Sequence, residues 1–185
     1  RVEMPTVKNE RQVYVDRRQV LQLARACRHR GVRALILLAF YSGMRVAEIQ
    51  RAERDGENFV LHDTKNGDRR ALPLVGEAFA LMQERAKVRQ LKDDRVFPPV
   101  KEKAEQRSLR EAWENALEAA NIENFHWHDL RHTAASYLAM SGVSLVEIAK
   151  VLGHRTLAMV ARYAHLSEGH IVSTGQKLAE RLGVQ

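Results

Sequence analysis

The last third of the chain contains side chains that together could break and rejoin a phosphodiester. Residues 128–133 read His-Asp-Leu-Arg-His-Thr, residues 152–154 read Leu-Gly-His, and residues 162–165 read Arg-Tyr-Ala-His. Arginine offers a planar fork of donors to phosphate oxygens, imidazole exchanges protons near neutral pH, and a phenol can act as a nucleophile. This combination is what transfer of a phosphodiester onto a tyrosine requires.

Two arginines are candidates for holding the phosphate oxygens. Arg131 follows His128 on one face of a helix start, and Arg45 comes soon after Gly43, which ends an apolar run. Lysine would hold a phosphate less well, because it lacks the planar fork. Taken singly, either arginine would more often be one of many surface arginines.

Three further side chains could move protons or attack phosphorus. His128 has a reference pKa of about 6.5, so it could accept or donate a proton, although a capping or core histidine is the alternative. Tyr163, with a reference pKa of about 10, is a poor nucleophile unless cations favour its phenolate, and a tyrosine among apolar neighbours is more often a core residue. Lys65 could protonate a leaving oxygen, or be a solvated turn lysine.

The histidines also invite a metal-site interpretation. His126, His128 and His132 lie within one short stretch of the chain. Residues two apart diverge on a helix, however, and no carboxylate or cysteine completes a set of ligands. We therefore expect no metal ion and no other cofactor.

The hydrophobic pattern predicts the first elements that position these residues. Helical spacing over about 17–29 follows an Asp16 and Gln19 capping pair, and the apolar run 32–41 predicts a helix buried on most faces that Gly43 ends. The stretches 59–62 and 70–74 are β-prone, and the Asn66-Gly67 turn signal between them predicts a hairpin. Lys65 would then lie at the tip of a small antiparallel sheet.

Helical spacing resumes after the hairpin. We expect a helix through residues 79–86, a charged loop over 92–107, and a helix that a Ser108 and Glu111 capping box begins. Further helices are expected from Asp129 to about 142, from the capping residue Ser144 to Gly153, and from about 156, with Tyr163 at or just past its end. The predicted fold class is α+β, mainly α-helical with a small antiparallel β-sheet.

Composition limits the class of protein. The chain has 185 residues, 45% of them hydrophobic, which suits one well-filled domain. Its net charge of +7 favours a polyanionic partner. The single Cys27 excludes an internal disulfide and suits a reducing cytoplasm, and no apolar run reaches the length of about 20 residues that a membrane span needs. Residues 1–12 have no helical period and are interpreted as a linker cut from a longer protein.

In this order and spacing, the segments resemble the tyrosine recombinase (phage integrase) family over roughly residues 13–170. Ser42, Ala134 and Val160 replace commoner family residues, which affects packing details only. Glu48 is similar to the acidic residue that braces an arginine and a histidine there, and His132 lies in the usual Leu-Arg-His-Thr run. The resemblance implies an active site formed by Arg45, Lys65, His128, Arg131, His154 and Tyr163.

The resemblance also implies a mechanism. Tyr163 would attack the scissile phosphate, forming a 3′-phosphotyrosine and releasing a 5′-hydroxyl. Arg45, Arg131 and His154 would hold the non-bridging oxygens, His128 would handle the proton of the nucleophile, and Lys65 would protonate the leaving oxygen. Neither ATP nor a metal ion would be needed, because the phosphotyrosyl bond conserves the energy of the phosphodiester.

Family architecture gives the remaining expectations. Residues 1–12 would link to a missing N-terminal core-binding domain, 13–185 would form the catalytic domain, and the tail helix within 167–185 would dock onto a neighbouring protomer or onto its own domain. Double-stranded DNA would be the substrate, with a homotetramer on DNA and a mainly monomeric isolated domain. The alternatives are a type IB topoisomerase that relaxes supercoils and a DNA-binding protein that has lost catalysis.

Overall fold

The structure is a computed structural model of the chain. It describes residues 15–55, 58–61, 70–71, 74–87, 96–97, 103–154, 156–167 and 169–183. Both Lys65 and the expected linker 1–12 lie outside these residues. None of the helices in the described ranges has the length and hydrophobicity that crossing a bilayer requires.

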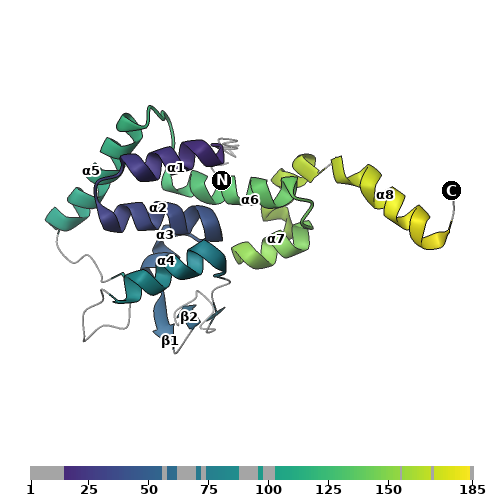
Figure 1. Cartoon of the computed structure of the whole chain (residues 1–185), viewed down its shortest axis with the longest axis horizontal. Helices are drawn as coiled ribbons and strands as arrows, with labels where there is room; N and C mark the ends of the chain where they lie inside the picture. Colours follow the sequence, from purple (N-terminus) through teal and green to yellow (C-terminus); the bar gives the residue numbers. More distant parts are fainter. Residues whose placement is uncertain are drawn as a thin grey trace, which may run out of the picture.

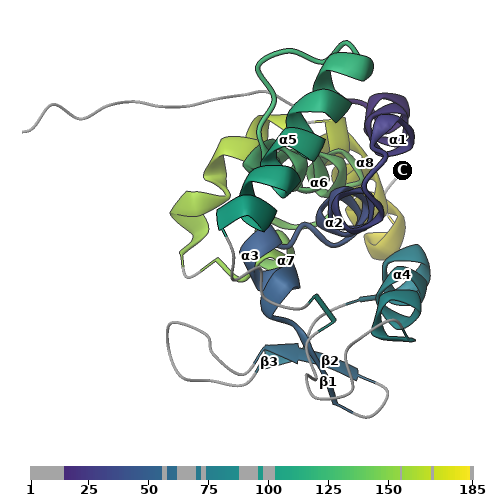
Figure 2. The same cartoon turned by 90° about the vertical axis from the view of Figure 1, so that its left-hand side faces the viewer.

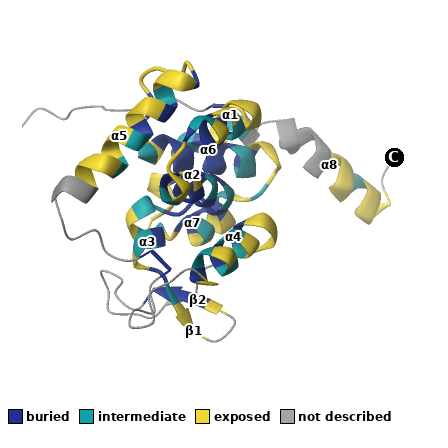
Figure 3. Ribbon diagram, turned by 60° about the vertical axis from the view of Figure 1, so that its left-hand side comes forward, coloured by how far each residue is buried: buried dark blue, intermediate teal, exposed yellow. Residues whose placement is uncertain are grey.

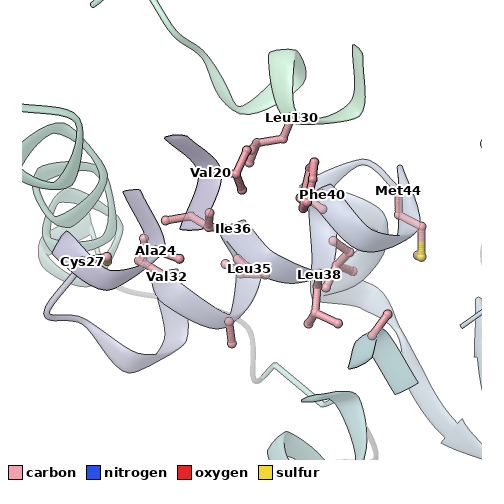
Figure 4. Close-up of a cluster of buried hydrophobic side chains, with 14 of the residues drawn as sticks. Val20, Ala24, Cys27, Val32, Leu35, Ile36, Leu38, Phe40, Met44 and Leu130 are labelled. Atoms are coloured by element: carbon pink, nitrogen blue, oxygen red, sulfur yellow. The ribbon is translucent and has the colours of Figure 1, made fainter. Parts of the chain in front are cut away.

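Helix α2 (Arg30–Ser42) is the centre of the fold, as its apolar sequence predicts. It packs against α1 (Arg17–Ala26) and against three later helices, α4 (Gly76–Lys87), α5 (Lys103–Ala119) and α6 (Trp127–Met140). Figure 4 shows Val20 and Ala24 of α1 facing Val32 and Ile36 of α2, with Leu130 of α6 above them. The buried residues gather along these helices and the exposed ones on their outer faces (Figure 3).

The turn between α1 and α2 differs from its prediction. Helix α1 ends at Ala26, so the predicted extent of 17–29 was too long. The Nε and Nη2 atoms of Arg33 donate to the carbonyl oxygen of Cys27 at 3.0 and 2.7 Å, and Nδ1 of His29 accepts from the backbone N–H of Val32 at 3.2 Å. His29 thus caps a new helix, and the chain turns before the first one can continue.

The small sheet has the strand order β1-β2-β3, with β1 at Glu53–Asp55, β2 at Asn58–Leu61 and β3 at Arg70–Ala71. Both pairings are antiparallel, and Val60 pairs with Ala71. The predicted pairing of 59–62 with 70–74 is therefore confirmed in its described part. Strand β1 was not predicted, because it is short, charged and mostly exposed. The sheet lies at one end of the molecule, next to α3 and α4 (Figure 2).

Helix α5 begins earlier than predicted. It starts at Lys103, so Ser108 lies inside the helix, the capping-box prediction was wrong, and the expected loop 92–107 ends sooner. Trp113 of α5 stacks on Trp127 at 4.0 Å between ring centroids, which joins α5 to the start of α6. This stacking holds α5 against the start of the helix that carries His128 and Arg131.

The C-terminal half is confirmed in outline. Helix α7 (Leu145–Leu152) begins at its Ser144 cap and ends at Gly153, and two short 3₁₀ turns follow, η1 (Leu157–Met159) and η2 (Ala161–Ser167). Tyr163 lies inside the second turn and not past the end of one helix. Helix α8 (Gly169–Leu182) then leads away from the helical body (Figure 1). The mainly helical α+β class is confirmed.

Candidate active site

The candidate site lies where two helices, α2 and α7, each end at a glycine. Helix α2 ends at Gly43 with φ 64°, and α7 ends at Gly153 with φ 67°, both in the left-handed region that glycine adopts without strain. The chain after Gly43 turns into α3 (Val46–Arg51), with Arg45 as its N-cap, and the residue after Gly153 is His154. The first turns of α6 and the turn η2 complete the site.

Arg131 joins the two helix ends. Its side chain is only 2% exposed, and it donates from Nη1 to the carbonyl oxygen of Gly43 at 2.9 Å and from Nη2 to that of Leu152 at 2.7 Å. A carboxylate oxygen of Glu48 lies 3.9 Å from Nη1. The guanidinium therefore fixes the relative position of the segments that carry Arg45 and His154.

Glu48 supports the other arginine more directly. Its Oε1 accepts from Nη1 of Arg45 at 3.0 Å, and its Oε2 accepts from the backbone N–H of Arg45 at the same distance. The Arg45 side chain is 38% exposed, against 14% for Glu48. One carboxylate thus begins α3 and orients a guanidinium that remains open on the solvent side.

The histidines of α6 lie beside the tyrosine of η2. The ring of His128 is perpendicular to that of His132, with 4.7 Å between centroids, and Nδ1 of His132 forms a hydrogen bond with the hydroxyl of Tyr163. Tyr163 is 5% exposed and packs with Val160, Ile148 and Leu152. It is thus a core residue by burial and a site residue by its hydroxyl group.

Burial dominates the proton affinities of this group. It raises the pKa of Tyr163, which the cations Arg162 and Arg131 partly oppose. Burial, followed by the charges of Arg131 and Arg45, lowers the pKa of His128. Burial, and then His128 and Arg162, lower the pKa of His132 to about 4. At neutral pH the phenol is therefore protonated and both imidazoles are neutral.

His154 adds a third imidazole to the site. Its backbone N–H donates to the carbonyl oxygen of Ala149 at 2.8 Å, which seats it at the end of α7. Burial, and then Arg131 and Arg45, lower its pKa to about 4. Nδ1 of His154 is buried and has no partner among the described residues. A buried nitrogen without a partner costs stability, and an added phosphate oxygen nearby would favour a protonated ring.

An open cavity of about 790 Å³ lies against Arg45 and the three histidines. Two further side chains of η2 line this cavity, Arg162 and His165, and neither was among the predicted site residues. Arg162 directly precedes Tyr163 in the sequence, which is the signal that could have identified it. The lining comprises Arg45, His128, His132, His154, Ala158, Met159, Ala161, Arg162, Ala164 and His165.

The remaining predicted residues stand as follows. The structure brings Arg45, Glu48, His128, Arg131, His132, His154 and Tyr163 together, whereas Lys65 lies outside the described residues. His126 points elsewhere, since its Nδ1 lies 3.6 Å from Asp129 and its side chain is 63% exposed. Within the described part of the chain, no cluster of metal-ligating side chains is found.

Two curated relatives share long stretches of this sequence. The chain is 40% identical to the integrase of Salmonella phage P22 over 72 residues, which are 39% of this chain and 19% of that protein. It is 31% identical to the shufflon-specific DNA recombinase of Escherichia coli over 180 residues, which are 93% of this chain and 45% of that protein. The chain thus spans less than half the length of these relatives.

Solved structures show the same fold. The catalytic domain of bacteriophage HP1 integrase matches with a TM-score of 0.68 and 24% identity, covering 93% of this chain and 98% of that one. A lambda integrase tetramer bound to a Holliday junction matches with a TM-score of 0.59 and 17% identity, covering 81% and 47%. The sequence profile of the phage integrase family matches residues 14–170, and the chain belongs to that family.

Proposed function

We propose that this chain is the catalytic domain of a site-specific DNA recombinase of the integrase type. It would cleave and rejoin double-stranded DNA through a 3′-phosphotyrosyl intermediate. One observation carries the proposal: the hydroxyl of Tyr163 meets His132 beside a cavity into which Arg45, His128 and His154 also project. The names of the relatives, an integrase and a DNA recombinase, support the same activity.

In the cleavage step, the phenolic oxygen of Tyr163 bonds to phosphorus and the bond from phosphorus to the 5′-oxygen breaks. Arg45, Arg131 and His154 would bind the non-bridging oxygens of the phosphate. Lys65 would protonate the leaving oxygen. The phenol proton would pass to an imidazole of α6, a role that the resemblance gives to His128. Rejoining reverses these transfers.

This chemistry depends on prearranged charge. Negative charge grows on the non-bridging oxygens in the transition state. The guanidinium groups of Arg45 and Arg131 and a protonated His154 would stabilise this charge, because the fold already holds them in position. The phosphotyrosyl bond keeps the energy of the broken bond, so the proposal includes no ATP, metal ion or other cofactor.

The net charge of the chain supports the proposed DNA partner. The net charge of +7 suits double-stranded DNA, whose phosphates release counterions when basic side chains bind them. We place residues 1–12 as a linker to a core-binding domain, 13–185 as the catalytic domain, and the protein in the cytoplasm. Helix α8 within 167–185 would dock onto a neighbouring protomer in a homotetramer on DNA.

Covalent trapping tests the function. Nicked duplexes tiled across the DNA that flanks the gene would lose a short fragment after cleavage, so rejoining fails and the protein stays on the DNA. We expect the wild-type chain to give an adduct on a denaturing gel in EDTA, and Tyr163→Phe to give none while it folds and binds DNA normally. An adduct with Tyr163→Phe, or no wild-type adduct on any duplex, would contradict the proposal.

A further inference from the structure

Two imidazoles of α6 lie near the nucleophile, but they are not equivalent. Nδ1 of His132 forms a hydrogen bond with the hydroxyl of Tyr163, and the ring of His128 packs perpendicular to the ring of His132. Among the described residues, the Tyr163 hydroxyl has no hydrogen-bond partner besides His132. The geometry thus separates His132, which is hydrogen-bonded to the reacting oxygen, from His128, which packs against the ring of His132.

The direction of this hydrogen bond follows from the protonation of its partners. Burial raises the pKa of Tyr163 above its ordinary value, so the phenol keeps its proton at neutral pH. Burial also lowers the pKa of His132 to about 4, so its ring is neutral and one nitrogen is free to accept. The hydroxyl of Tyr163 therefore donates to Nδ1 of His132, and the proton on His132 resides on Nε2.

Resting on the proposed function, we infer that His132 is the base that takes the proton of Tyr163 during attack, and that His128 positions His132. As the phenolic oxygen bonds to phosphorus, its proton moves to Nδ1 of His132. The bond from phosphorus to the 5′-oxygen breaks, and that oxygen takes a proton from a separate acid. His132 is a catalytic residue in this scheme, because it touches the attacking oxygen.

The charged groups around His132 make its proton affinity depend on whether the substrate is bound. An imidazolium next to Arg131 and Arg162 is costly while the cavity is empty. A bound phosphate brings negative charge that offsets these cations, so the proton affinity of His132 rises when the substrate arrives. The titratable and charged groups that face His132 come from α6, η2 and the end of α7: His128, Asp129, Arg131, Arg162, Tyr163 and His154.

Replacing His132 tests the inference by the pH dependence of cleavage. We expect His132→Ala to lower single-turnover cleavage by about 10²-fold or more at neutral pH, as general-base catalysis is worth about that much. Its rate should then rise about tenfold per pH unit between pH 6 and 8, because the phenol must ionise unaided. The wild-type rate should change little over this range. A purely structural role would lower the rate equally at every pH.

Two matched variants separate base catalysis from positioning. In His132→Asn, the amide oxygen can accept the hydrogen bond of Tyr163 but cannot take its proton. We expect this variant to unfold at the wild-type temperature and yet show the slow, pH-dependent cleavage of His132→Ala. We expect His128→Asn to be slower than wild type with a flat pH profile, since it leaves His132 in contact with Tyr163.

A substrate with sulfur in place of the bridging 5′-oxygen identifies the step affected. The thiolate leaves without a proton, so this substrate restores variants that lack the acid but not those that lack the base. We expect no restoration of His132→Ala. Restoration, a uniform loss at all pH values, or cleavage by His132→Asn within a fewfold of wild type would overturn the inference. These outcomes require a wild-type adduct, whereas failure of the proposed function is the absence of that adduct.

Discussion

At the scale of single residues, Arg45 and Arg131 have different surroundings although they were predicted for one role. Arg131 is buried and donates to two helix-terminal carbonyl groups, those of Gly43 and Leu152. Arg45 is partly exposed, and its guanidinium is paired with Glu48 at the edge of the cavity. We therefore expect Arg131 to contribute to stability as well as to the proposed phosphate binding, and Arg45 mainly to the proposed phosphate binding.

Lysine substitutions should separate these contributions. We expect Arg45→Lys to reduce single-turnover cleavage about 10²-fold or more, because the paired donors to developing charge are lost, with little change in stability. Arg131→Lys should lose similar activity and also about 1.5–3 kcal/mol of unfolding free energy, since one ammonium cannot span both carbonyl groups. Urea unfolding and covalent trapping measure the two effects. Equal stability of the two variants would contradict the structural role of Arg131.

The sequence revealed residue types more readily than contacts. His128 and Arg131 could be identified because both lie on one helix turn, where spacing fixes their relative positions. The contact of His132 with Tyr163 joins α6 to η2, and local spacing holds no information about it. Arg162 lies next to Tyr163 in the sequence, which was a usable signal, but that its side chain lines the cavity is visible only in the folded chain.

At the scale of elements, the predicted helix ends were correct where the flanking residues did not favour further helix. Gly43 and Gly153 end helices in the left-handed conformation, and the Ser144 cap begins α7 as expected. The Ser108 signal failed because residues 103–107 include good helix formers that extend α5 upstream. A capping sequence cannot act as a cap where helix continues on both sides.

Gly43 gives a prediction at this scale. A Cβ added there would lie 2.7 Å from Cδ2 of Leu152, on a backbone with φ +64°. We expect Gly43→Ala to cost at least about 1–2 kcal/mol of unfolding free energy for the left-handed conformation, and to reduce cleavage by displacing Arg45. The control is Gly175→Ala in α8, where an added Cβ meets nothing within 4 Å. Urea unfolding should show a loss for the first variant only. Equal stability would mean that Leu152 moves aside and the helix end tolerates a side chain.

At the scale of the whole molecule, the tail differs from the rest. Leu178 and Leu182 of α8 are 60% and 67% exposed, whereas each of the helices α1 to α7 contributes buried apolar residues to one of two clusters. Such an exposed apolar stripe is typical of a surface that another chain covers. A single short helix offers a small interface, so it favours association only where DNA holds the protomers close together.

Deleting residues 170–185 tests this interpretation of the tail. We expect the fold to survive, because α8 contacts the body through η2 at its start and leads away from it (Figure 1). Thermal unfolding and single-site trapping should stay near wild type, sedimentation should show a monomer with or without the tail, and recombination between two sites should fall severely.

A double substitution of Leu178 and Leu182 by Gln should reproduce the recombination defect without removing the helix, whereas Gln176→Glu on the same exposed helix should not. If the truncated chain unfolds, or recombines as well as the intact one, the tail packs on its own domain or is dispensable, and docking in trans is wrong.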